Sequence, residues 1–164
     1  MMKQEEKMYN IPAFLKYLNV ENAKSDVLHV VNYEHHNQIP LRSEPVSIDF
    51  YVLAIKTNSD ITPAENRSAS YAYLDCPTNS LEWNYSSKFS GYAMFITPKL
   101  FDKYAKEYNF KHYNNHEALF LTLEEEETLQ DLFKKSFKEY QKENFSKEVI
   151  VSYASLILSY IQLF

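Results

Sequence analysis

Glycine, cysteine and arginine are nearly missing from this chain of 164 residues, and each shortage excludes a class of protein. The single glycine, Gly91, excludes a glycine-rich phosphate-binding loop. The single cysteine, Cys76, excludes an internal disulfide framework and is typical of a reducing compartment. Only Arg42 and Arg67 are arginines among 17 basic side chains, and 22 acidic side chains bring the net charge to −5. The chain therefore lacks the concentrated basic surface that nucleic-acid binding requires.

Long apolar runs are missing as well. No stretch approaches the roughly 18 uninterrupted apolar residues of a membrane span, and the first residues lack the apolar core of a signal peptide. We therefore expect a single cytoplasmic domain over residues 1–164, with no membrane contact. Aromatic residues, by contrast, are abundant: 14 Tyr, 11 Phe and one Trp make up 16% of the chain. Such rings fill the interior of sheets or line small-molecule pockets.

The first 97 residues favour strands. A short helix is expected over residues 10–18, and alternating or β-branched segments predict strands at 27–33, 46–56, 68–76, 81–85 and 92–96. Residues 46–56 give the clearest pattern, with two alternating sets of side chains on opposite faces. Several short strands separated by turns predict an antiparallel barrel or sandwich, and we expect a small antiparallel β-barrel over about residues 20–97. Gly91 is expected to mark a bulge or turn before the last strand.

The remaining residues, 98–164, favour helices, so the fold class is α+β. Thr97 is suited to cap a helix that begins at Pro98, and Thr122 with Glu125 forms the pattern of a capping box. Ser146 is suited to cap the last helix. The charges of the helix that follows Thr122 are interpreted as a solvated face, since acidic residues come first and lysines later.

The last helix carries two neighbouring apolar seams. Residues 149, 153, 156, 160 and 163 form one, and residues 150, 154, 157, 161 and 164 form the other. One seam is enough to dock a helix on its own domain, and the second indicates a partner helix. The alternative is a helix buried at the centre of a monomer. The apolar end of the chain, up to Phe164, predicts that the protein continues beyond it.

The order of these segments resembles the N-terminal cupin-like sensing and dimerisation domain of AraC-type transcription regulators. The resemblance is carried by Asp49-Phe50-Tyr51, by Leu81-Glu82-Trp83-Asn84, by residues 91–101 and by the final helix, residues 149–164. It implies a cupin-like jelly roll that binds a small effector, followed by a helical hairpin that mediates homodimerisation. A helix-turn-helix domain, and with it DNA binding, would lie after residue 164.

The resemblance also implies that the chain is not an enzyme and needs no cofactor. It places the dimer interface on the last helix, at Val149, Tyr153, Leu156, Ile157, Tyr160 and Leu163. Rings on the alternating strands are the candidates for effector binding: Tyr33, Tyr51, Tyr71, Tyr73, Trp83 and Tyr92. The alternative for each ring is plain core packing.

No motif in the sequence predicts catalysis or a metal site. His35 and His36 are adjacent, so their side chains would point to opposite faces of a strand. His112 and His116, with Glu117, are spaced for chelation on a helix, but two asparagines between them disfavour a helix.

Four further residues are candidates for chemistry. His29 lies in an apolar strand, which indicates a hydrogen-bonded core or pocket histidine. Asp49 and Asp75 are a conceivable carboxylate pair, although Asp75 before a proline is typical of a turn. Cys76 is interpreted as a small apolar filler. Two other functions stay open: a metal-dependent cupin-like enzyme and a stand-alone small-ligand-binding protein.

Overall fold

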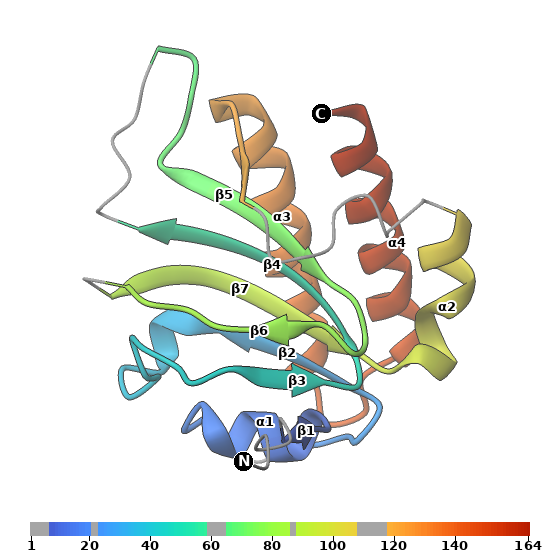
Figure 1. Cartoon of the computed structure of the whole chain (residues 1–164). Helices are drawn as coiled ribbons and strands as arrows, with labels where there is room; N and C mark the ends of the chain where they lie inside the picture. The colour runs from blue at the N-terminus through green and yellow to red at the C-terminus, as the bar shows by residue number, and fades with distance from the viewer. Residues whose placement is uncertain (1–6, 21–22, 59–64, 86–87, 108–117) are drawn as a thin grey trace.

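The computed structural model describes residues 7–20, 23–58, 65–85, 88–107 and 118–164, and it has the mixed α+β class that the sequence predicts (Figure 1). The strands are β1 (Met8–Tyr9), β2 (Leu28–Asn32), β3 (Val46–Ile48), β4 (Tyr51–Asn58), β5 (Ser70–Asp75), β6 (Ser80–Leu81), β7 (Phe89–Ile96) and β8 (Leu119–Phe120). The helices are α1 (Ile11–Tyr17), α2 (Pro98–Glu107), α3 (Leu123–Tyr140) and α4 (Lys147–Leu163), with a short 3-10 helix η1 (Tyr33–His35).

Two sheets divide the strands. The larger has the order β2-β7-β4-β5-β8 and is antiparallel throughout. The smaller has the order β1-β3-β6, in which β1 and β3 run parallel and β3 and β6 antiparallel. Across the described ranges no strand is shared between these two sheets, so the barrel predicted from the sequence is not closed. The chain leaves the small sheet at Ile48 and enters the large one at Tyr51, which splits the predicted strand 46–56 in two.

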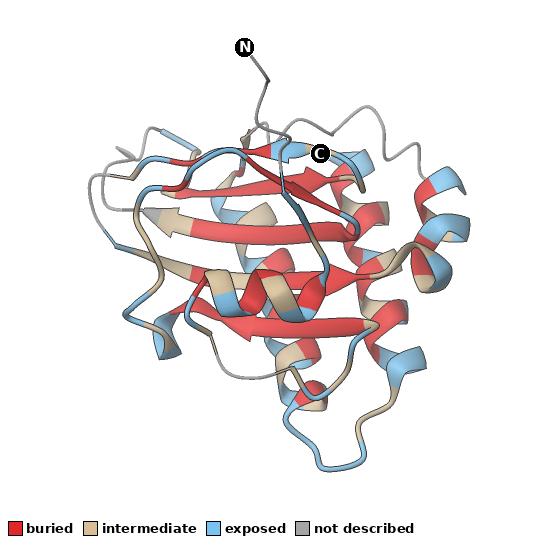
Figure 2. Ribbon diagram, turned by 60° about the horizontal axis from the view of Figure 1, so that its bottom comes forward, coloured by how far each residue is buried: buried red, intermediate tan, exposed pale blue. Residues whose placement is uncertain are grey.

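The larger sheet is buried on both faces (Figure 2). Helices α3 and α4 cover one face, and helix α1 lies in front of the other (Figures 1 and 2). The predicted alternation of residues 46–56 is confirmed in spite of the break. Val46, Ile48, Phe50, Val52 and Ala54 pack with helix α1, whereas Tyr51, Leu53 and Ile55 pack with the C-terminal helices.

Thr122 and Ser146 cap their helices as predicted, whereas Thr97 does not cap helix α2, because its hydroxyl is buried with no hydrogen-bond partner among the described residues. The side chain of Asn10 accepts a hydrogen bond from the backbone N–H of Ala13 at 2.9 Å, which caps helix α1. Thr122 and Glu125 form the reciprocal capping box of helix α3, and Ser146 caps helix α4. Within the described ranges, none of these helices has the length and hydropathy needed to span a bilayer.

Gly91 lies inside strand β7, two residues after the strand begins, and not before it as the sequence predicted. Its φ of +124° is rare for any residue with a side chain. A Cβ atom built at this position would lie 2.0 Å from the carbonyl oxygen of Ile55 on strand β4. Glycine is therefore required because β7 and β4 approach each other closely here, at the register where Gly91 pairs with Lys56.

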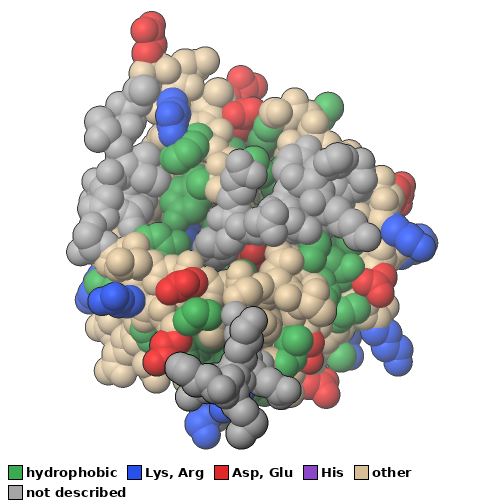
Figure 3. Space-filling view, viewed as in Figure 1, with side chains coloured by type: hydrophobic (Ala, Val, Ile, Leu, Met, Phe, Trp, Pro, Cys, Tyr) green, Lys and Arg blue, Asp and Glu red, His purple; other side chains and the backbone are tan. Residues whose placement is uncertain are grey.

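The surface shown in Figure 3 has no single basic patch among its coloured residues. Lys and Arg side chains are scattered mainly around the rim of this face, with Asp and Glu between them. Hydrophobic side chains reach the surface in the hollow between the sheet strands (Figure 3). The distribution agrees with the net charge of −5.

Candidate functional site

The candidate site is a buried lysine on the α1 side of the large sheet. Strand β4 directs Val52, Ala54 and Lys56 toward this side because side chains alternate along a strand. Lys56 is only 5% exposed, and its Nζ donates a hydrogen bond to the hydroxyl of Tyr85 at 3.1 Å. Lysine is almost never this deeply buried without an anionic partner. Among the described residues, no carboxylate forms an ion pair with it.

Four aromatic rings surround the ammonium group. The Lys56 Nζ lies 4.2 Å from the ring centre of Phe89, 4.8 Å from those of Tyr73 and Tyr85, and 5.3 Å from that of Tyr33. These distances are within the range of cation–π attraction, which is stronger for a desolvated cation. Burial nevertheless lowers the pKa of Lys56 to about 7, with the nearby charge of Asp75 opposing the change. At neutral pH the amine is therefore present in both its charged and its neutral form.

Tyrosine hydroxyls form pairs around the lysine. The Tyr33 and Tyr73 hydroxyls lie 3.4 Å apart, and the Tyr71 hydroxyl donates to that of Tyr85 at 3.1 Å. Burial raises the pKa of all four phenols, so each stays protonated at neutral pH. The site thus offers hydroxyl donors and one amine within an aromatic enclosure.

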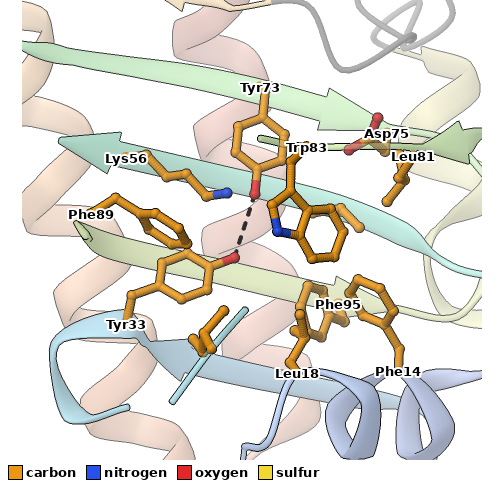
Figure 4. Close-up of a pocket in the computed structure, with 12 residues that line it drawn as sticks. Phe14, Leu18, Tyr33, Lys56, Tyr73, Asp75, Leu81, Trp83, Phe89 and Phe95 are labelled. Atoms are coloured by element: carbon orange, nitrogen blue, oxygen red, sulfur yellow. Dashed lines mark hydrogen bonds between the residues drawn. The ribbon is translucent and has the colours of Figure 1, made fainter. Parts of the chain in front are cut away.

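A small cavity lies beside these groups (Figure 4). Its volume is about 20 Å³, which is room for about one water molecule. Phe14 and Leu18 of helix α1 form one wall, and Trp83 stands between Lys56 and Asp75 in this view (Figure 4). The indole N–H of Trp83 donates to the backbone carbonyl of Pro40 at 2.8 Å, which fixes the ring in the wall.

The structure brings four of the six predicted ligand residues to this side of the sheet. Tyr33, Tyr73 and Trp83 line the cavity, and Tyr71 reaches the lysine through the hydroxyl of Tyr85. The other two, Tyr51 and Tyr92, lie on the opposite face of the sheet, because side chains alternate along a strand and theirs point away from the side that Lys56 occupies.

Tyr51 and Tyr92 contact the C-terminal helices and not the cavity. The ring of Tyr51 packs against Phe101 of helix α2, and its hydroxyl donates to Asp102. Tyr92 packs against Phe133 and Phe137 of helix α3. The structure therefore gives these two rings a role in packing the helices on the sheet.

Sequence reasoning missed Lys56, Tyr85 and Phe89 as members of the site. The alternation of strand 46–56 contained a usable signal for Lys56, because the even-numbered positions Val52 and Ala54 are apolar and position 56 continues their face. A lysine on such a face is either at the sheet edge or buried for a reason. Tyr85 gave no comparable signal, since its place depends on the path of the chain between β6 and β7, and Phe89 precedes residues 92–96, where the sequence predicts the last strand.

The predicted core histidine is confirmed. His29 is 6% exposed, and its Nδ1 lies 2.7 Å from the hydroxyl of Tyr140 on helix α3. Burial lowers the pKa of His29 to about 4, with smaller effects from His36 and Lys24. The ring is therefore neutral at pH 7 and belongs to the packing between sheet and helices, outside the cavity.

Asp75 reaches the cavity, and the other polar candidates lie elsewhere. It is fully buried at the end of strand β5 and not in a turn as the sequence predicted, whereas Asp49 is exposed at the turn between β3 and β4. Cys76 packs at the edge of the core, as predicted. His35 is exposed, with its ring against Phe137.

In the part of the chain that the structure describes, no group of three or more His, Cys, Asp or Glu side chains could hold a metal ion. His112, His116 and Glu117 lie outside the described residues.

A second surface of interest is the outer face of helix α4. Of the two predicted seams, residues 150, 154, 157 and 161 are buried in the chain's own core. In the other seam Val149, Leu156 and Leu163 are 39%, 42% and 80% exposed, and Tyr153 and Tyr160 are half-buried. Ile157, which was assigned to the dimer interface, is fully buried and has no surface to offer a partner.

The chain matches no protein-family model, no curated protein and no solved structure.

Proposed function

We propose that this chain is the effector-sensing and dimerisation part of an AraC-type transcription regulator with a cupin-like fold. In this proposal the chain is not an enzyme, works in the cytoplasm and reaches DNA only through a helix-turn-helix domain beyond residue 164. The observation that carries the proposal is the small cavity beside Lys56, where a buried amine and tyrosine hydroxyls lie against a space lined by rings. Few convergent polar groups in an apolar pocket are typical of a small-molecule site.

The large sheet supplies a physical link between this cavity and the helices. Strand β4 presents Lys56 to the cavity and, one residue earlier, Ile55 to the core beneath helices α3 and α4. Strand β7 does the same with Phe95 and Met94. A ligand that moves one face of these strands therefore changes the packing of the helices on the other face. Effector binding would in this way shift the population of helix arrangements available to a dimer.

Helix α4 supports the choice of a second copy of the chain as the partner. The exposed seam Val149, Tyr153, Leu156, Tyr160 and Leu163 has the alternating 4 and 3 spacing that pairs with itself in a coiled coil. Self-complementary apolar stripes are typical of two-fold symmetric dimers. The seam runs over most of the helix, Lys147–Leu163, a length of roughly 25 Å at about 1.5 Å per residue.

Sedimentation equilibrium tests the dimer directly. We expect the chain to sediment as a dimer at micromolar concentration and Leu156→Lys to shift it to a monomer, because the lysine places a charge at the centre of the seam. Gln162→Lys is the matched control, since Gln162 is exposed on the same helix and lies about 120° around it from Leu156. A chain that is a monomer before any substitution would refute the interface, as would a dimer that both variants leave intact.

A further inference from the structure

Lys56 has more hydrogen-bonding capacity than its described neighbours use. A lysine ammonium has three N–H donors, and here the single described hydrogen bond goes to Tyr85. The rest of the group faces aromatic rings, of which Phe89 is the nearest at 4.2 Å. Burying a charge with so few partners is unfavourable, so a larger fraction of Lys56 is neutral than of an ordinary lysine. A desolvated lysine of this kind is a nucleophile for carbonyl compounds.

We propose that Lys56 captures small aldehydes, of one to about three carbons, by forming an imine inside the cavity. The proposal deepens the proposed function, since it takes the cavity as the effector site and names the chemical class of the effector. It does not depend on the dimer.

The size of the cavity determines the size of the aldehyde. A volume of about 20 Å³ holds about one water molecule, so the cavity takes the carbonyl group of the aldehyde, and an alkyl group of one or two carbons would extend into an adjoining hollow of about 100 Å³. An aromatic aldehyde has no room unless several rings move.

A route to the surface adjoins the cavity. A separate hollow of about 100 Å³ is lined by Tyr33, Ile39 and Phe89, which are also part of the cavity wall. Lys88 lies at the outer side of this hollow and is exposed. Phe89 and Ile39 are walls of both spaces, so a movement of either side chain is the step by which we expect the hollow to join the cavity.

The reaction balances without an added reactant. The lone pair of neutral Lys56 forms a C–N bond to the aldehyde carbon, and a proton moves from nitrogen to oxygen to give a carbinolamine. Loss of that oxygen as water then leaves the C=N bond, with no oxidation or reduction. The Tyr85 hydroxyl, 3.1 Å from Nζ, is placed to accept and return protons. The protonated phenols of Tyr33 and Tyr73 are placed to donate hydrogen bonds to the carbonyl oxygen.

Reductive trapping tests the proposal on the intact chain. The protein is incubated at pH 7 with acetaldehyde and cyanoborohydride, and peptide mass spectrometry measures ethylation at each lysine over time. At this pH about half of Lys56 is neutral, against roughly one part in 3,000 for a lysine with the ordinary pKa of 10.5. We expect Lys56 to be labelled at least about tenfold faster than exposed Lys88 and Lys147, even if access slows it.

Variants and a larger aldehyde separate the possible results. Tyr85→Phe keeps the amine and should slow labelling of Lys56 relative to Lys147, whereas Lys56→Met should leave the labelling of Lys88 and Lys147 unchanged. Benzaldehyde should label the exposed lysines but not Lys56. Labelling of Lys56 no faster than Lys147, or only after urea is added, would overturn the proposal.

Two other outcomes distinguish a failure of the aldehyde proposal from a failure of the proposed function. If Lys56 is not labelled but another small molecule raises the melting temperature and Lys56→Met removes the effect, the cavity remains the effector site and the aldehyde class is refuted. If Lys56 is labelled while the chain is a strict monomer, the capture chemistry is supported and the dimeric regulator is refuted.

Discussion

Replacement of Lys56 by methionine should remove a large pH dependence from the stability of the fold. Methionine has nearly the same length and fills the same space without a titrating group. In the native protein the pKa of Lys56 is lowered to about 7 by burial, whereas the unfolded chain has the ordinary value of 10.5. Between these two values the unfolded chain binds more protons than the folded one, so the free energy of unfolding rises with pH.

The expected size of the effect follows from the two pKa values. Well inside the window each pH unit changes the free energy of unfolding by about 1.4 kcal/mol. At pH 7 half of the folded molecules still carry the proton, so the first unit contributes less, about 1 kcal/mol. Between pH 7 and pH 9 the native chain should therefore gain about 2 kcal/mol from Lys56.

The upper limit of pH 9 keeps the tyrosines out of the measurement. Tyr33, Tyr73 and Tyr85 have raised pKa values in the folded state, so they lower the stability only when the unfolded phenols ionise, near pH 10. The remaining titratable groups are also present in Lys56→Met, so the comparison of the two proteins isolates the effect of Lys56.

Urea unfolding at pH 7, 8 and 9, followed by the fluorescence of Trp83, gives the free energies. The protein concentration must be held constant, because a dimer makes stability depend on it. The native chain should become more stable by about 2 kcal/mol across this range, and Lys56→Met should stay within about 0.5 kcal/mol. An equal rise in both proteins would show that Lys56 does not titrate in this window, and the description of the site would be wrong.

Two further predictions concern the fold around the site. Gly91→Ala should destabilise the chain by about 3 kcal/mol or more, because φ is +124° and the new Cβ would meet the Ile55 carbonyl. Thermal unfolding measures this loss, and Ser90→Ala, one residue earlier, is the control that should be nearly neutral. A mild effect of Gly91→Ala would refute the close approach of the strands. The pKa of His29 is lowered to about 4 from 6.5, so the unfolded state gains the proton first as the pH falls. Between pH 6.5 and pH 4 this residue should lower the free energy of unfolding by about 2.5 kcal/mol. In His29→Gln this part of the acid-induced loss of stability should be absent. An acid titration of stability that is the same in both proteins would contradict the burial of a neutral ring.

Local patterns in the sequence predicted the elements and their faces well. The capping box of Thr122 and Glu125 is a matter of residues three apart, so it forms regardless of the rest of the fold. The alternation over residues 46–56 also survived the bend at Asp49 and Phe50, because a connection of two residues keeps the side-chain period of two in phase between β3 and β4. The two seams of the last helix gave the right spacing, and the structure shows which of them is buried.

The site depends on contacts that the local pattern does not contain. Tyr51 and Tyr92 were chosen with Tyr73 because all three are rings on strands, yet they occupy the helix-facing side. Which face meets the helices and which meets α1 is determined by the pairing order β2-β7-β4-β5-β8, and that order is not visible in single strands. The closed barrel was wrong for a related reason, since the passage from β3 to β4 transfers the chain between sheets.

The single glycine connects the fold to the site. Gly91 is the cross-strand partner of Lys56, and Phe89, two residues earlier on the same strand, supplies the ring nearest to the lysine nitrogen. A side chain at position 91 would meet the Ile55 carbonyl and force β7 away from β4 at this pair. Phe89 would then move with β7, and the enclosure around the amine would open to water. Opening would return the pKa of Lys56 toward its ordinary value, so any Gly91 variant that still folds should lose both the pH-dependent stability and the selective labelling of Lys56.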